Sequence, residues 1–362
     1  MEQQLAIAFP AGEYLSDELA ARNWSQTEFA EILGRPTQFV SEIVSGKKEI
    51  TRESAAQIGA ALGTSAEVWL NLQNSYLLWQ QSKDVHAQSQ LNDVRRRARL
   101  NALAPIGVLK KRGYLAGNSL DELESEILQL FKIADLNEEP ALLAAAKRSN
   151  VDEPLTPTQN AWLACARNLA EMSDARPFDR EGLKQLAETL STHLADPEAF
   201  NELPALFATV GVRLVYVEAL PASKLNGASF LLDGDSQKPV VAISGRGKRL
   251  DKVLFTLLHE VAHVVNGDVH GGVVLHDELS HTLGDEQAAD IRAANWLVPG
   301  ELPAIQLPIR AQWIANAAAK TGVHPIVIIG KLQNDRVLDW RTQLVKGAPS
   351  VTSHLERWHK RR

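Results

Sequence analysis

Apolar residues recur at every third or fourth position through the first 80 residues, which predicts a series of short amphipathic helices. Ser25 and Glu28 form a capping box ahead of the second helix, and Gly34 closes that helix. The expected caps of the third, fourth and fifth helices are Thr37, Thr51 and Ser65. Two short helices joined by a tight glycine-containing turn, inside a five-helix unit, predict a helix-turn-helix DNA-binding domain over residues 1–82.

Helical periodicity continues from residue 83 to residue 200 without a cluster of reactive side chains, which predicts a helical connector. Ser119 and Glu122 form another capping box within it. Residues 93–112 carry seven basic side chains, which are Arg95, Arg96, Arg97, Arg99, Lys110, Lys111 and Arg112. This run is either a solvated helix face or a set of phosphate contacts beside the helix-turn-helix domain.

Strand patterns appear only after residue 200. Short apolar or β-branched runs between turn residues predict three strands, Arg213–Val217, Ala228–Leu232 and Pro239–Ser244. Helical patterns follow from Leu250 onward, so residues 201–345 are expected to form an α+β domain with a small sheet, ahead of a basic tail at 346–362. The predicted fold is therefore multidomain, with an all-α head, a helical connector and an α+β domain.

The helix that begins at Leu250 carries the sequence L-H-E-V-A-H. His259 and His263 are four residues apart and share one helix face, so two neutral imidazoles can meet a single Zn²⁺. Glu260 lies beside them and can act as the base that activates water. The alternative is a buried helix with two unrelated histidines. The spacing favours zinc.

A catalytic zinc ion needs a third protein ligand. Glu286 opens a second helical run in which Ala289, Ala293 and Leu297 fall on the same stripe, and the two alanines allow close approach to the first helix. Its alternative role is to complement the dipole of its own helix. Three histidines in the intervening loop could serve as second-shell groups or polarise a substrate carbonyl, and no spacing singles one out; they are His270, His276 and His281.

Composition narrows these options. Cys165 is the only cysteine, so no intrachain disulfide can form and zinc must be held by histidine and carboxylate. The net charge of −6 argues against indiscriminate nucleic-acid binding but permits a local basic patch. The first 80 residues hold five basic and ten acidic residues, so a protein-interaction or dimerisation role for the head is the alternative. No secretory signal or long apolar run is visible, so we expect a cytoplasmic protein without a membrane partner.

The head resembles the HigA-type antitoxin branch of the Xre helix-turn-helix family. The motifs, which extend from Phe9 to about Trp79, are F-P-A-G-E-Y-L, W-S-Q-T-E-F-A-E-I-L-G-R-P, V-S-E-I-V-S-G-K-K-E-I-T and A-L-G-T-S-A-E-V-W-L-N-L-Q. The resemblance implies that the third helix enters the major groove of a double-stranded DNA operator. The implied groove-facing residues are Arg35, Thr37, Gln38 and Ser41, with Lys47 and Lys48 on phosphates.

The C-terminal half resembles the ImmA/IrrE family of metallopeptidases, in the gluzincin arrangement. Its motifs are L-F-T-L-L-H-E-V-A-H and E-Q-A-A-D-I-R-A-A-N-W-L-V-P. The resemblance implies His259, His263 and Glu286 as zinc ligands and Glu260 as general base. Asp290 stands where the family commonly has an asparagine. Arg246 and Arg249 fit either a substrate- or nucleic-acid-facing pair or a solvated one.

Together the two resemblances imply a DNA-binding transcriptional regulator with a zinc-dependent endopeptidase domain. The implied substrate is an Xre-type repressor or the chain itself, in a stress, phage or toxin–antitoxin context. Two alternatives stay open: a non-catalytic antitoxin and autorepressor that binds a toxin, and a transcription factor whose peptidase-like fold senses a metabolite. A sensor has no need of Glu260, which favours the enzyme. A homodimer is a further expectation.

Overall fold

The computed structural model describes residues 8–140, 146–148, 155–277 and 284–358. It divides the chain into two compact units, Met1–Arg97 and Ala98–Arg362. Residues 98–200 belong to the second unit, and their buried side chains pack in its two hydrophobic cores. They were predicted to be part of a helical connector.

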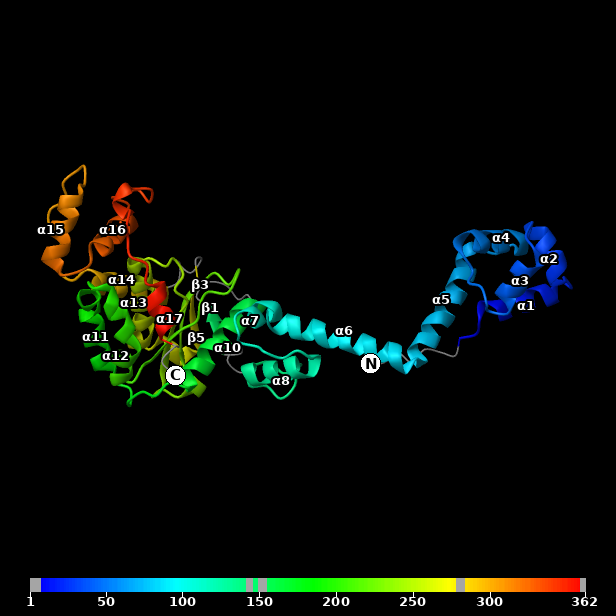
Figure 1. Cartoon of the computed structure of the whole chain (residues 1–362), viewed down its shortest axis with the longest axis horizontal. Coiled ribbons are helices and arrows are strands. Elements are labelled where there is room, and N and C mark those ends of the chain that lie inside the picture. The colour runs from blue at the N-terminus through cyan, green and yellow to red at the C-terminus, as the bar shows by residue number, and fades with distance from the viewer. Residues whose placement is uncertain (1–7, 141–145, 149–154, 278–283, 359–362) are drawn as a thin grey trace. The chain divides into compact units, whose positions relative to one another are not determined.

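The first unit is the helical head (Figure 1). Its helices are α1 (Ala11–Ala21), α2 (Gln26–Leu33), α3 (Thr37–Val44), α4 (Arg52–Leu62) and α5 (Ala66–Lys83). The capping box of Ser25 and Glu28 is present, and Thr51 and Ser65 cap α4 and α5. The cap predicted at Thr37 is wrong: Pro36 occupies the N-cap position without a side-chain hydrogen bond, so Thr37 is already helical. Apolar faces of all five helices meet in one core, which includes Leu15, Phe29, Val40, Ile58 and Trp69.

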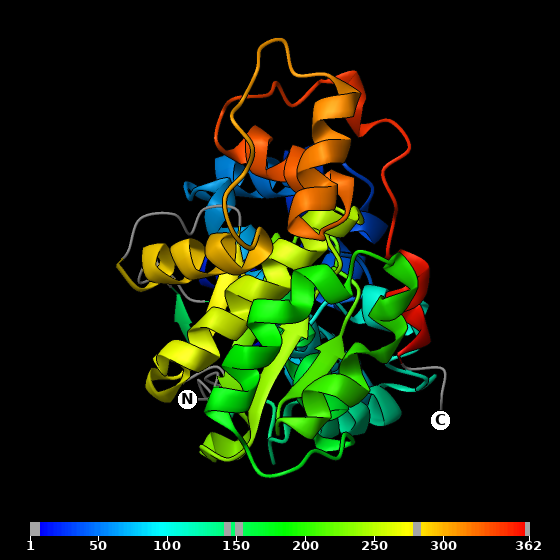
Figure 2. The same cartoon turned by 90° about the vertical axis from the view of Figure 1, so that its left-hand side faces the viewer.

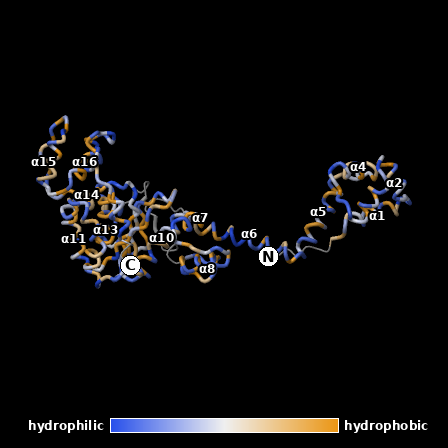
Figure 3. The backbone as a smooth tube through the Cα atoms, viewed as in Figure 1, coloured by the Kyte–Doolittle hydropathy of each residue, from blue (hydrophilic) through white to orange (hydrophobic). Residues whose placement is uncertain are grey.

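Helix α6 (Val85–Leu103) follows and is mainly hydrophilic along its length (Figure 3). Leu100 is buried, and it packs in a core that also contains residues of α7 (Ile106–Lys111) and α8 (Leu120–Phe131). Ser119 and Glu122 cap α8 as predicted.

Within the described residues the second unit contains one five-stranded sheet in the order β1-β5-β3-β4-β2. Its strands are β1 (Ala146–Arg148), β2 (Arg213–Tyr216), β3 (Leu225–Leu231), β4 (Pro239–Ile243) and β5 (Val273–Asp277). The three predicted strands are confirmed as β2, β3 and β4. Strand β5 lies in a segment predicted as a loop, and it pairs antiparallel with β3.

Both faces of this sheet are covered by helices, which explains why its strands are apolar at successive positions. Val241 and Ile243 of β4 face a core with α11 (Arg180–His193), α13 (Leu250–Asn266) and α14 (Gly284–Leu297), whereas Val240 and Ala242 face a core with α10 (Pro157–Glu171). Figure 2 shows α11 and α13 side by side along one face of the sheet.

The remaining elements complete the second unit. They are η1 (Pro197–Glu202), α12 (Leu203–Thr209), η2 (Leu232–Gly234), η3 (Asp268–Gly271), α15 (Ala311–Thr321), α16 (Pro325–Asn334), η4 (Gln343–Val345) and α17 (Thr352–Arg357). None of the helices in the described ranges combines the length and apolar character needed to cross a membrane.

Candidate metal centre and DNA-binding surface

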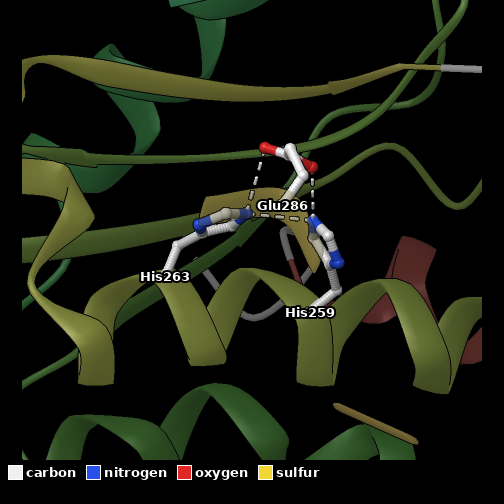
Figure 4. A group of neighbouring side chains, drawn as sticks. All are labelled: His259, His263 and Glu286. Carbon is white, nitrogen blue, oxygen red and sulfur yellow. Dashed lines mark hydrogen bonds and ion pairs between the residues drawn. The ribbon is translucent and has the colours of Figure 1, made fainter. Parts of the chain in front are cut away.

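Two packed helices bring the three predicted metal ligands together. His259 and His263 project from adjacent turns of α13 toward Glu286, which lies in the first turn of α14 (Figure 4). Ala289 and Ala293 of α14 are fully buried, and such small side chains let the two helices approach closely. The two imidazole Nε2 atoms are 3.0 Å apart, and the Glu286 oxygens lie 3.2 Å and 3.4 Å from them.

This donor set fits a zinc ion. Ligand atoms that bind a tetrahedral zinc ion at about 2.0–2.1 Å lie roughly 3.3 Å from one another, which matches the observed separations. The Nδ1 atom of His259 is 2.9 Å from Asp290 Oδ1, and that of His263 is 2.7 Å from Asp268 Oδ2. These carboxylates favour a proton on Nδ1, so both Nε2 lone pairs are available to a metal.

The two histidines and Glu286 shift one another's pKa values. Burial lowers the pKa of His259, but hydrogen bonds with Asp290 and Glu286 outweigh burial and raise that pKa to about 9. In the same way Asp268 and Glu286 raise the pKa of His263 to about 10. Burial favours a protonated Glu286, but the two histidines outweigh it and lower its pKa to about 2. The carboxylates of the site therefore stabilise positive charge on the two histidines. A metal dication at the same place would be stabilised by the same carboxylates and would compete with these protons.

Glu260 is completely buried beside the three ligands. Its Oε2 accepts a hydrogen bond of 2.6 Å from Ser229, and its Oε1 has no hydrogen-bond partner among the described residues. Gly227 makes room for this carboxylate, since a Cβ atom there would lie 2.6 Å from Oε1. Burial raises the pKa of Glu260 to about 7. A carboxylate with that pKa can both accept and release a proton near neutral pH.

The structure distinguishes among the loop histidines. His276, on β5, is buried and stacks on His259 with ring centroids 4.1 Å apart. Its Nδ1 lies 3.8 Å from Glu260 Oε1 and has no hydrogen-bond partner in the described part of the chain. His270 is exposed in η3, away from the ligands, and His281 lies outside the described residues.

The two arginines that precede α13 have different surroundings. Arg249 donates to both oxygens of Asp251 at 2.7 Å and to Gln333 Oε1 at 3.0 Å. Arg249 therefore forms an internal ion pair. Both predictions for this residue, a contact with substrate or nucleic acid and a solvated position, are wrong. Arg246 is half-buried and lines a cavity beside the metal centre.

The residues predicted to contact DNA lie on and around α3. Thr37, Gln38, Ser41 and Lys47 are exposed. Acidic neighbours contact three of the six residues. Arg35 pairs with Glu53 and donates to Gln57, Gln38 donates to Glu42 Oε1 at 2.7 Å, and Lys48 lies 3.7 Å from Glu42 Oε2. Contacts of these three side chains with bases or phosphates would compete with Glu42 and Glu53.

Several residues around the metal centre were not predicted to take part. Ser229 and Gly227 lie on β3, more than 30 positions before Glu260, and only the contact between the sheet and α13 brings them together. Asp268 follows the C-terminal end of α13, and no motif marks it. Asp290 is four residues after Glu286, so its position on the same face of α14 was the one available signal.

Comparisons with known proteins concern the head. A family model described as "Helix-turn-helix" matches residues 15–69. The uncharacterized HTH-type transcriptional regulator YddM of Escherichia coli (strain K12) is 33% identical over 74 residues, which are 20% of this chain and 79% of that protein.

Two solved structures are also similar. An addiction module antidote protein of a HigA family from Coxiella burnetii is 30% identical, with 24% of this chain and 94% of that chain covered and a TM-score of 0.22. A candidate antidote protein of a plasmid maintenance system from Nostoc punctiforme is 34% identical, with 24% and 97% covered and a TM-score of 0.22.

Proposed function

We propose, from the premise that the chain belongs to the helix-turn-helix family of transcriptional regulators, that it couples DNA binding to a zinc-dependent endopeptidase. The head would bind a double-stranded DNA operator through Arg35, Thr37, Gln38, Ser41, Lys47 and Lys48. The second unit would be a gluzincin-like peptidase, with His259, His263 and Glu286 as ligands.

One observation carries the enzymatic half of this proposal. A buried carboxylate that is not needed as a ligand, that of Glu260, adjoins two imidazole nitrogens and a carboxylate whose nearest atoms are 3.0–3.4 Å apart, close to the separations in a tetrahedral zinc site. A purely structural zinc site is closed by four protein ligands, whereas this group, within the described residues, offers three. The fourth position would be left for water and substrate.

The chain's own residues can perform peptide hydrolysis in two proton transfers. When bound, the zinc ion supplies Lewis acidity to water and to the scissile carbonyl. Glu260 takes a proton from the attacking water, whose oxygen forms a bond with the carbonyl carbon. Glu260 then gives that proton to the leaving nitrogen as the C–N bond breaks, which releases a carboxylic acid and an amine. Ser229, through its hydrogen bond, holds the carboxylate in place for both steps.

His276 is suited to donate a hydrogen bond to the oxygen of the scissile carbonyl. Burial lowers its pKa to about 3, so the ring is neutral and one of its two nitrogens carries hydrogen. Stacking on His259 fixes the ring next to the metal centre, on the wall of the neighbouring cavity. A neutral N–H group there can donate to the oxygen on which negative charge develops.

The proposed substrate is an Xre-type repressor, either a separate protein or this chain's own head. The test is to incubate the zinc-loaded protein and its Glu260→Gln variant with candidate repressors and to identify fragments by mass spectrometry. The proposal predicts new peptide termini with the native protein and none with Glu260→Gln. Identical fragments from both proteins, or no fragments from any repressor or from the chain itself, would remove the enzymatic half and favour a sensor or a non-catalytic antitoxin.

A further inference from the structure

A cavity of about 420 Å³ adjoins the metal centre. His276 contributes to its wall and also stacks on the ligand His259, so the cavity and the ligands share a boundary. Phe255 and Thr256, one turn before His259 on α13, form another part of the lining. A substrate chain held at the metal would therefore have a neighbouring side chain within reach of this space, whose volume is typical of ligand pockets.

A buried network holds the cavity walls together. Asp251, on the first turn of α13, is paired with Arg249, which also donates to Gln333 of α16. The side-chain amide of Gln333 donates in turn to the carbonyls of Asp339 and Trp340, at 3.3 Å and 3.4 Å, which ties the Trp340 segment to α16. Gly330 permits this arrangement, because a Cβ atom there would lie 2.3 Å from Asp251 Oδ2.

The charges in the lining are unequal. Among the described residues that line the cavity, the basic side chains are Arg246, Lys252 and Lys331, and the one carboxylate is that of Asp251. Arg249 already neutralises Asp251, so this acid does not offset the cavity's positive charge. Lys331 pairs with Asp335 at 2.5 Å.

Lys252 is placed differently from Lys331. In the described part of the chain it has no carboxylate partner, and its ammonium lies 5.7 Å from the ring centroid of Trp340. An aromatic face holds a cation without neutralising it. The lining therefore combines the positive charge of Lys252 with apolar side chains that include Phe255 and Leu297.

We propose that this cavity is a specificity subsite that takes an acidic side chain of the peptide substrate, with Lys252 as the main charge contact. The proposal rests on the endopeptidase function proposed above. The methylene groups of a glutamate or aspartate would lie against Phe255, and the carboxylate would meet Lys252. A small free carboxylic acid presents the same carboxylate without a peptide. The experiment therefore tests a peptide and a small acid separately.

The experiment measures binding rather than cleavage, by calorimetry with zinc-loaded Glu260→Gln protein. The probes are heptapeptides of alanine and leucine that carry one glutamate at each position in turn, with a matched set that carries glutamine. N-acetylglutamate is the small-acid probe. Lys252→Met removes the proposed contact, Lys252→Arg keeps the charge, and Lys320→Met removes an exposed lysine that does not line the cavity. Lys252 is exposed, so these variants are expected to fold, and zinc content confirms it for each.

We expect at least one glutamate peptide to bind about fivefold more tightly than its glutamine twin, a factor typical of one partly exposed ion pair. Lys252→Met should abolish that preference, and Lys252→Arg and Lys320→Met should keep it. Equal binding of the twins, or a preference that survives Lys252→Met, overturns the subsite. Binding of N-acetylglutamate as tight as that of the best peptide overturns the peptide assignment.

The two proposals can fail separately. Acid-selective binding without any cleavage by the native protein would leave the subsite and remove the endopeptidase. Cleavage by the native protein without acid-selective binding would leave the endopeptidase and remove the subsite.

Discussion

Each ligand histidine has two ring nitrogens, and a carboxylate decides which one can reach a metal. Asp290 accepts from His259 Nδ1 and Asp268 accepts from His263 Nδ1, so both rings present Nε2 to Glu286. An asparagine at position 290 could accept the same hydrogen bond through its side-chain oxygen.

Asp290→Ala should lower zinc affinity by roughly 10–100-fold, because partners of this kind fix the orientation and basicity of the ligand ring. Asp290→Asn should lower it less. Competition with a fluorescent zinc chelator measures both constants. Equal affinity in the native protein and Asp290→Ala would show that the hydrogen bond does not orient His259.

Cys165 lies on α10, is almost completely buried, and has no role in the proposed chemistry. Burial raises the pKa of its thiol to about 12, from an ordinary value of 9.0. A raised pKa means that the folded state binds the proton more tightly, so this contribution to stability is complete below pH 9 and is lost as the pH rises toward 12.

Iodoacetamide at pH 8 should therefore leave the native protein unlabelled, because only the thiolate reacts and burial disfavours it. The same reagent should label every chain in urea. Mass spectrometry of intact protein reads both results, and rapid labelling of the native protein would contradict the packing described for α10.

Local patterns at the scale of single elements were predictable from the sequence. The capping boxes of α2 and α8 involve residues three positions apart, and the strands β2, β3 and β4 contain short apolar or β-branched runs between turn residues. The His259–Glu260–His263 spacing is equally local. Glu286 could be proposed because small residues repeat along its helix face.

Contacts that depend on the sheet could not be predicted in this way. Strand β5, V-V-L-H-D, follows glycines that suggest a loop, and its pairing with β3 is what puts His276 beside Glu260. Ser229 reaches Glu260 across 31 positions. The contact between Arg249, just before α13, and Gln333 of α16 spans 84 positions, and no single motif predicts it.

The basic run on α6 bears on DNA binding. Arg95, Arg97 and Arg99 are exposed, whereas Arg96 lies 3.7 Å from Asp93. If the three exposed arginines contact phosphates, replacing them with glutamine should reduce the slope of log affinity against log salt by roughly 0.9 for each lost contact. Arg310→Gln, at an exposed arginine ahead of α15, is the control. An unchanged slope in the triple variant would assign the run to a solvated helix face.

At the scale of the whole molecule, one chain would join a peptidase to a repressor-like head. Linkage by a flexible segment raises the effective concentration of two parts to roughly millimolar, so an unrestrained peptidase would threaten its own chain. We expect such self-cleavage at Asp152–Pro157, because its two prolines and few apolar residues predict local exposure; residues 152–154 lie outside those that the structure describes.

We expect the native protein to purify intact and to be restrained until a signal or partner acts. Under inducing conditions it should cut either its own chain or a partner repressor, and Glu260→Gln should cut neither. Immunoblots of cells that express each protein, with transcription of the target measured alongside, test this. Identical fragments and identical transcription under every stress would favour the sensor or antitoxin alternative.

Zinc content is the most direct test of the central claim, that His259, His263 and Glu286 hold a metal while Glu260 does not. Inductively coupled plasma mass spectrometry of the purified native protein should give about one zinc ion per chain, as a three-ligand catalytic site implies. Glu260→Gln should keep that content, and His259→Ala and Glu286→Ala should lose most of it. Absence of zinc from the native protein after growth with ample zinc, or full occupancy in Glu286→Ala, would contradict the account.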